Sequence, residues 1–168
     1  MNATMIVRSC VEADLEQLNE IYNHYVATSA ATFDLDPIPM DVRKDWFGKY
    51  AETGPHRLFV AVEGDTVLGY ADSHQVRLKP AYITSVETSV YLRPAATGRG
   101  IGTALYETLF TALAGEDVHR AYAAVTDIPN PASVALHERF GFHYVGTFHE
   151  QGRKFGRYWD VPWFEKEL

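Results

Sequence analysis

The stretch VETSVYLRP at residues 86–94, followed by GRGIG at residues 98–102, predicts a strand that leads into an anion-binding turn. Apolar and polar residues alternate along it, which is the period of a half-buried strand. One face carries Val86, Val90 and Leu92, and the other carries Glu87, Ser89 and Tyr91. Pro94 has no backbone N–H for a neighbouring strand and so ends this one. We therefore expect a central strand with one polar face open to chemistry.

A helix is predicted to begin inside the glycine segment. Apolar residues recur at four-residue steps, at Ile101, Leu105, Leu109 and Leu113, which gives one stripe of an amphipathic helix. Free N–H groups and the helix dipole favour a phosphate at such an N-terminus. The residues that have no side chain to keep a phosphate from the backbone are Gly98, Gly100 and Gly102.

This turn matches neither of two familiar phosphate-binding loops. No Gly-Lys-Ser/Thr follows, and no first glycine stands where the dinucleotide-binding fingerprint needs it. A small-residue turn before a helix also serves as a plain connection. The stretch alone leaves both interpretations open, and the rest of the chain must decide between them.

Length and composition indicate one domain that spans residues 1–168, with a sizeable core. The content of 46% hydrophobic and 22% charged residues is ordinary for a globular protein. A formal net charge of −7 argues against nucleic acid or an anionic membrane as the main partner. We expect a small-molecule substrate.

The cysteine and histidine residues indicate whether the protein has disulfides or a metal site. The one cysteine, Cys10, precludes an internal disulfide, and the N-terminus shows no secretory leader or long apolar span. We therefore expect a cytoplasmic protein in which Cys10 is an inert thiol. The seven histidines show no paired metal-ligand spacing, so we expect no metal.

The order of predicted elements indicates an α/β (α+β) fold. Ser9 with Glu12 has capping-box spacing for the first helix, and Asn130 with Pro131 is typical of another helix start. Trp46, Phe47 and Tyr50 predict a helix that ends near residues 54–55. The expected strands cover residues 5–7, 58–62, 67–71, 86–92, 121–125, 142–148 and 158–164. Together they predict a mixed, mostly antiparallel sheet with helices on both faces.

Several motifs resemble those of one enzyme family. The central strand, the GRGIG turn and the segment NPASVALHERFGF at residues 130–142 together resemble the GNAT acyltransferase superfamily. IYNH at residues 21–24, TF at 32–33, ETSVY at 87–91, LHE at 136–138 and KFGRYWD at 154–160 resemble its phosphinothricin and methionine sulfoximine N-acetyltransferase group. The turn of the superfamily usually opens with Gln or Arg, where this chain has Thr97. Backbone N–H groups hold most of the anion, so we expect Thr97 to modulate affinity.

The resemblance implies acetyl-CoA as the acetyl donor. Its pyrophosphate would lie on the amides of Gly98, Arg99, Gly100, Ile101, Gly102 and Thr103. Its pantetheine arm would lie beside the backbone of Val90, Tyr91 and Leu92, where the family strand splays from its neighbour. Asn130 would hydrogen-bond the arm, cap its helix or do both, since a cap uses only the side-chain oxygen.

The resemblance also implies an acid and a base. Transfer of acetyl to an amine needs a neutral nitrogen and a proton for the leaving thiolate. We interpret Glu87 as the base, acting directly or through water, although an ion pair with Arg77 is the structural alternative. His137 occupies the position where most of the superfamily has a tyrosine acid, although a helix histidine is often structural. Exchanged roles, with His137 as base and Glu87 orienting the amine, stay open.

The acceptor is expected to be an amino acid or a close analogue. Arg77 would hold its carboxylate through a bidentate fork, with Lys79 as a second cation or a solvated residue. The other residues expected to contact the acceptor are Tyr82, Thr88, Ser89 and Phe33. Phe33 matches a family aromatic that reaches the substrate from a neighbouring subunit, which implies a homodimer.

The basic cluster Arg153, Lys154 and Arg157 is either solvated or bound to the adenosine 3′-phosphate.

Two other functions compete with this interpretation. One is a non-catalytic acyl-CoA sensor, which would need neither Glu87 nor His137. The other is acetylation of a protein or aminoglycoside amine, although a polycationic acceptor calls for an acidic pocket, and Arg77 and Lys79 favour an anionic one.

Overall fold

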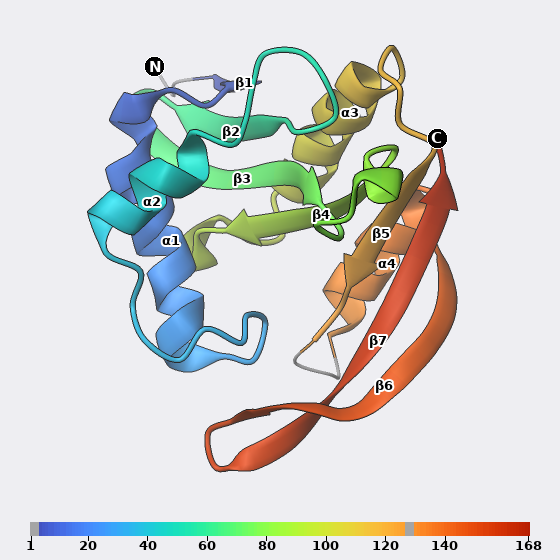
Figure 1. Cartoon of the computed structure of the whole chain (residues 1–168). Helices are drawn as coiled ribbons and strands as arrows, with labels where there is room; N and C mark the ends of the chain where they lie inside the picture. The colour runs from blue at the N-terminus through green and yellow to red at the C-terminus, as the bar shows by residue number, and fades with distance from the viewer. Residues whose placement is uncertain (1–3, 127–129) are drawn as a thin grey trace.

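The computed structural model describes residues 4–126 and 130–168 as one seven-stranded sheet with helices packed on it (Figure 1). The strands are β1 (Met5–Ser9), β2 (Leu58–Glu63), β3 (Thr66–Gln75), β4 (Ser85–Leu92), β5 (Arg120–Ala124), β6 (His143–Lys154) and β7 (Arg157–Glu167). The α-helices are α1 (Leu15–Thr28), α2 (Met40–Phe47), α3 (Ile101–Leu113) and α4 (Pro131–Arg139). Short 3₁₀ turns cover Glu12–Asp14, Pro80–Tyr82 and Pro94–Ala96.

The strands run in the spatial order β1-β2-β3-β4-β5-β7-β6. Every neighbouring pair is antiparallel except β4 and β5, which are parallel. The parallel pairing is short: it runs from Ser85 opposite Arg120 to Glu87 opposite Tyr122. Beyond it the two strands diverge, as Figure 1 shows. The splay that the family resemblance implied is therefore present.

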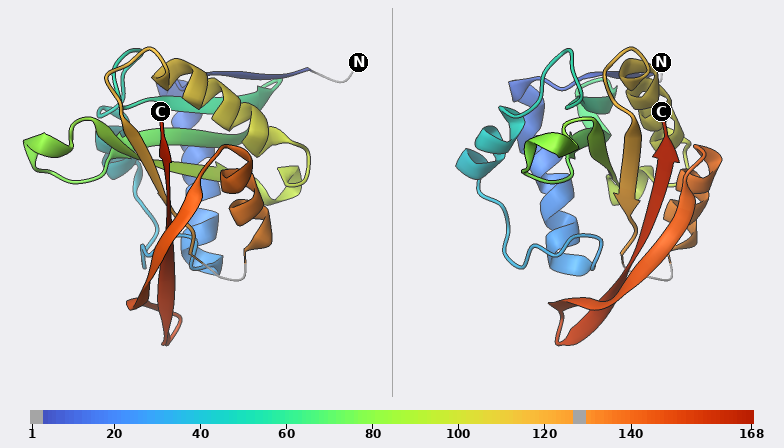
Figure 2. Two further views of the ribbon diagram at one scale, coloured as in Figure 1. Left: turned by 90° about the vertical axis from the view of Figure 1, so that its right-hand side faces the viewer. Right: turned by 45° about the vertical axis from the view of Figure 1, so that its right-hand side comes forward.

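Helices cover both faces of the sheet, as expected (Figure 2). On one face α3 and α4 pack over a core that includes Leu105, Leu109 and Phe142. On the other face α1 and α2 pack over a second core that includes Leu18, Val60 and Tyr70. None of the helices in the described part of the chain is long and apolar enough to cross a membrane.

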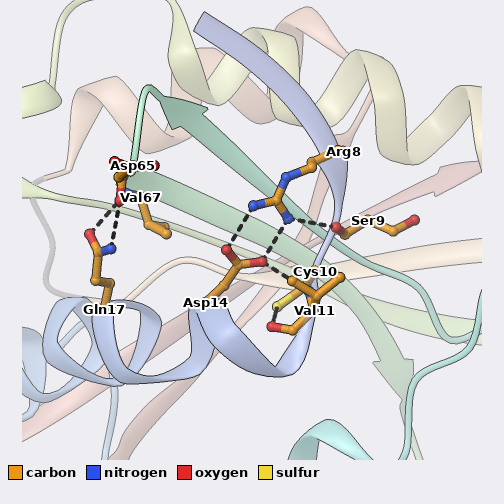
Figure 3. Close-up of polar contacts among 8 residues, drawn as sticks. All are labelled: Arg8, Ser9, Cys10, Val11, Asp14, Gln17, Asp65 and Val67. Carbon is orange, nitrogen blue, oxygen red and sulfur yellow. Dashed lines mark hydrogen bonds and ion pairs between the residues drawn. The ribbon is translucent and has the colours of Figure 1, made fainter.

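The start of α1 differs from the prediction of a capping box at Ser9 and Glu12. The Asp14 carboxylate, not a serine hydroxyl, accepts a hydrogen bond from the Val11 N–H at 2.9 Å (Figure 3). Arg8 reaches the same carboxylate through two hydrogen bonds of 2.7 and 2.8 Å. Asp14 is preferred because one carboxylate accepts from the backbone and from a charged fork, which a hydroxyl cannot do.

Several predicted boundaries differ from those of the structure. Strands β6 and β7, for example, end at Lys154 and Glu167 and not at residues 148 and 164. Helix α2 ends at Phe47, so Tyr50 lies outside it, on the segment that leads to β2. Strand β3 runs to Gln75 and not to Ala71, because its last residues pair with β4 up to Val86. The greater length of β3 matters for the site, because it places two more polar residues, Asp72 and His74, on the strand next to β4.

Candidate active site

Strand β4 separates two cavities. The α1–α2 cavity has a volume of about 640 Å³ and includes Arg43, Trp46 and His74 in its lining. The β4–β5 cavity, in the gap left by the diverging strands, has a volume of about 580 Å³ and includes Thr88, Asn130 and His137. The residues common to both linings are Glu87, Ser89 and Tyr91. Two ligands held in the two cavities would therefore meet at this part of β4.

The β4–β5 cavity runs along an unpaired strand edge to the glycine turn. Its lining includes Val90, Tyr91 and Leu92 and, beyond them, Thr97 and Gly98. Gly98 and Gly100 have φ angles of +75° and +77°, in the left-handed region that favours glycine. Apart from the adjacent residues in the chain, no described atom lies within 4 Å of where a Cβ would stand at either residue. These two glycines thus shape the turn and leave its backbone uncovered at the start of α3.

Gly102 has a different role from the one that the sequence predicted. A Cβ there would lie 3.2 Å from Leu136 Cδ2 and 3.9 Å from Leu92 Cδ1, inside the protein. Gly102 is thus needed for close packing of α3 against α4, and its missing side chain does not open the path of a phosphate.

We expect Gly102→Val to lower the free energy of unfolding by about 1–3 kcal/mol, because its methyl groups would overpack this contact. Urea denaturation checks this, with Gly146→Val as the control, since nothing lies within 4 Å of a Cβ at Gly146. Equal stability of the two variants would contradict the packing role.

The side chains of the other turn residues are engaged within the protein. Arg99 forms an ion pair of 2.8 Å with Glu63, and Ile101 is buried in the core. The Thr97 hydroxyl donates to the Pro94 carbonyl at 3.0 Å. Thr103 is half-buried in the first turn of α3. Any anion held here would therefore depend on backbone N–H groups.

Asn130 and Trp163 also line this cavity. The Asn130 side-chain oxygen accepts from the Ser133 N–H at 3.2 Å and so caps α4. This leaves its NH₂ group available to a ligand, as the sequence indicated. The Trp163 Nε1 atom is buried with no hydrogen-bond partner among the described residues.

His137 lies in the wall of the β4–β5 cavity as part of a buried chain of hydrogen bonds. Its Nδ1 lies 2.7 Å from the Ser133 carbonyl, which only accepts, so Nδ1 carries the hydrogen. Its Nε2 lies 2.9 Å from the Tyr106 hydroxyl, which lies 3.3 Å from Thr88 Oγ1. Burial lowers the pKa of His137, although the bond to Ser133 opposes this effect. The neutral ring therefore accepts the Tyr106 hydrogen.

The polar face of β4 carries Glu87 at the junction of the cavities. Its partner is His74 on β3, whose Nε2 lies 3.8 Å from Glu87 Oε2. The alternative pairing of Glu87 with Arg77 is not present. Thr88 points to the opposite face, toward Tyr106, and is 4% exposed. Ser89, like Glu87, lines both cavities, whereas Thr88 lines only the β4–β5 cavity.

The predicted acceptor residues lie on the connection between β3 and β4. Arg77, Lys79 and Tyr82 are exposed and line neither cavity. Their neighbour Leu78 does line the α1–α2 cavity although it is 90% exposed. The three residues thus flank that cavity without entering it.

Phe33 lines the β4–β5 cavity of its own chain. Its ring lies so close over Gly152 of β6 that a Cβ at Gly152 would overlap it.

The basic cluster is solvated only in part: Arg153 and Arg157 are exposed, and Lys154 is not. Lys154 is 3% exposed and donates from Nζ to the Thr32 carbonyl at 2.8 Å, which ties β6 to the loop after α1. Arg153 and Arg157 lie over the rings of Tyr158 and Trp159, at 5.8 and 3.9 Å from the ring centroids. Both sequence interpretations are therefore wrong for Lys154, because tertiary packing buries it.

Sequence reasoning missed much of the α1–α2 cavity. Its wall is aromatic, formed by Tyr22, Trp46, Tyr50, Tyr70 and Tyr91. It also missed Asp72 and His74, which lie on the inner face of β3 opposite Ser89 and Glu87. Continued alternation beyond Ala71 was the signal that could have found them.

Two further expectations concern cysteine and metal. Cys10 is buried, and burial raises the pKa of its thiol to about 12, so the thiol is protonated and unreactive. Among residues 4–126 and 130–168, no group of three His, Cys, Asp or Glu side chains could hold a metal ion.

Comparisons with known proteins identify the family. The acetyltransferase (GNAT) domain matches residues 7–163. Phosphinothricin N-acetyltransferase of Streptomyces coelicolor is 54% identical over 168 residues, which cover 99% of this chain and 98% of that protein. The L-methionine sulfoximine/L-methionine sulfone acetyltransferase of Pseudomonas paraeruginosa is 32% identical, with coverage of 96% and 94%.

A solved structure agrees with these relatives. The GNAT superfamily phosphinothricin acetyltransferase from Sinorhizobium meliloti, in complex with acetyl-CoA, superposes with a TM-score of 0.87 at 32% identity. The match covers 98% of this chain and 89% of that chain. The fold, the cavity beside the splayed strands and the sequence relatives agree: this chain belongs to the GNAT acetyltransferase family.

Proposed function

We propose that this protein transfers an acetyl group from acetyl-CoA to the α-amino group of a small amino acid or analogue of the phosphinothricin or methionine sulfoximine type. The observation that carries the proposal is the meeting of two cavities at Glu87 and Ser89 on β4. Direct transfer needs donor and acceptor bound together at one point. The names of relatives at 54% and 32% identity support the substrate class.

The residues of the β4–β5 cavity fit acetyl-CoA, which supplies an acetyl group activated as a thioester. The backbone of residues 98–103 would hold its pyrophosphate at the start of α3. The unpaired edge of Val90–Leu92 and the NH₂ group of Asn130 would bind its amide-bearing arm.

Glu87 is the proposed base, acting directly or through water on the ammonium group of the acceptor. Its carboxylate is half-buried at the junction, so it can reach either cavity. His137 is the proposed acid, acting through Tyr106. For this step the neutral ring must first take up a proton from solvent at Nε2. Tyr106 would then give its own proton to the thiolate and receive the Nε2 proton, which leaves a neutral imidazole and a thiol.

Arg77 is the proposed clamp for the acceptor carboxylate. We expect Arg77→Ala to raise the KM of the acceptor with little change in the KM of acetyl-CoA, because a ground-state clamp binds substrate and transition state alike. Steady-state kinetics with each substrate varied in turn measures this. The control is Arg139→Ala, on the exposed side of α4. Unchanged constants for every active acceptor would contradict the clamp.

We also propose that the protein is a homodimer. Its family resemblance motivates this, and exposed apolar residues support it: Leu35, Leu78 and Ile83 are 67%, 90% and 53% exposed, and Leu78 lines the α1–α2 cavity. Light scattering after size-exclusion chromatography should give twice the mass of the chain. A monomer at micromolar concentration would contradict the proposal.

A panel assay tests the function as a whole. Acetyl-CoA is incubated with phosphinothricin, methionine sulfoximine, methionine sulfone, ordinary α-amino acids, an aminoglycoside and a peptide amine, and thiol release is measured. We expect turnover with the amino acid analogues. Binding of acetyl-CoA without turnover of any acceptor would favour the sensor, and turnover only of the aminoglycoside or peptide would favour the other rival.

A further inference from the structure

Three ionisable side chains form a row across β3 and β4. His74 lies opposite Glu87 in the antiparallel register, and Asp72 lies two residues before it on the same face. His74 Nδ1 is 2.7 Å from Asp72 Oδ2, and His74 Nε2 is 3.8 Å from Glu87 Oε2. The histidine therefore stands between two carboxylates, with one ring nitrogen toward each.

Asp72 holds His74 in place within this row. It is 3% exposed and also accepts a hydrogen bond of 2.7 Å from the Tyr50 hydroxyl. A buried carboxylate with two donors is held in one orientation. Burial opposes a charge on His74, but Asp72 and then Glu87 raise its pKa to about 10. At neutral pH the row thus holds one imidazolium between two carboxylates.

We propose that His74, fixed by Asp72, is a positioning residue that orients Glu87 toward the junction of the two cavities and favours its ionised form. The inference rests on the proposed function, in which Glu87 is the base. A carboxylate must be ionised to accept a proton, and a cation 3.8 Å away favours that form.

The other groups around the row do not replace His74. Arg43 and His56 line the same cavity from α2 and from the segment before β2. Arg43 donates a hydrogen bond to Asn19. The pKa of His56 is lowered, first by burial and then by the charge of His74. Tyr50 and Tyr91 have pKa values raised by burial and stay neutral. Among the described neighbours of Glu87, His74 is the cation in ion-pair contact with it.

The kinetic test is the pH dependence of kcat/KM in His74→Gln, which removes the charge and keeps a hydrogen-bonding group. We expect the acidic limb to move to higher pH, because the carboxylate loses its cation. A limb set by the amine of the acceptor would not move with this substitution. His143→Gln is the control, since His143 pairs with Glu165 on the distant β6–β7 ribbon. An unmoved limb in folded His74→Gln, with kcat unchanged, would overturn the inference.

A second test does not depend on activity. The imidazole of His74 is titrated by NMR and assigned by its absence in His74→Gln. We expect an apparent pKa near 10 and a lower value in Glu87→Gln. A titration at the ordinary value in the unsubstituted protein would overturn the inference. If that titration is as expected but no acceptor is acetylated, the proposed function fails and the charged row stands.

Discussion

Glu87→Gln is expected to reduce kcat/KM for the best acceptor by ~10²–10⁴-fold, the usual size of a general-base contribution. Gln keeps the shape of the side chain and loses its basicity, so the acidic limb assigned to Glu87 should disappear. Binding of acetyl-CoA, measured by calorimetry, should change little, because the turn that would hold the pyrophosphate lies at the other end of β4. Glu167→Gln, an exposed surface variant, is the control.

The same experiment separates the two possible assignments of acid and base. If His137 were the base, the acidic limb would survive in Glu87→Gln and vanish in His137→Asn. Under our proposal the limb survives in His137→Asn instead. Near-native rates in both variants would contradict both assignments and favour a sensor with incidental turnover.

Tyr106→Phe is expected to lower kcat by ~10²-fold, because it breaks the path from His137 to the thiolate while it keeps the buried ring. kcat/KM should fall by a similar factor, since the proton moves only in the transition state. The comparison variant is Tyr144→Phe, on the exposed face of β6.

The substitution also leaves His137 Nε2 without a partner. A buried acceptor left unpaired costs about 1–3 kcal/mol of stability, which urea unfolding measures separately from turnover. If Tyr106→Phe loses stability but keeps its rate, Tyr106 is structural and His137 does not act through it.

The sequence alone was enough to predict the elements and the family. Local periodicity specified the helix from Ile101 and the strand that carries Glu87, since alternation and four-residue steps depend on residues close in the chain. The Asn130 cap was predicted for the same reason, because it acts within one turn of helix. The splay after Glu87 came from family resemblance, since no local pattern encodes where a neighbouring strand departs.

Contacts between distant segments decided the rest. Gly102 reads locally as part of a phosphate turn, yet its position is set by Leu136 on another helix. Lys154 reads as a surface cation, yet it is buried against the Thr32 carbonyl, 122 residues away in the chain. His74 becomes a partner of Glu87 only because β3 and β4 pair in one register. The sequence thus shows which chemical groups each residue carries. The tertiary structure decides which of these groups are buried and which are in contact, since burial and pairing depend on residues far apart in the chain.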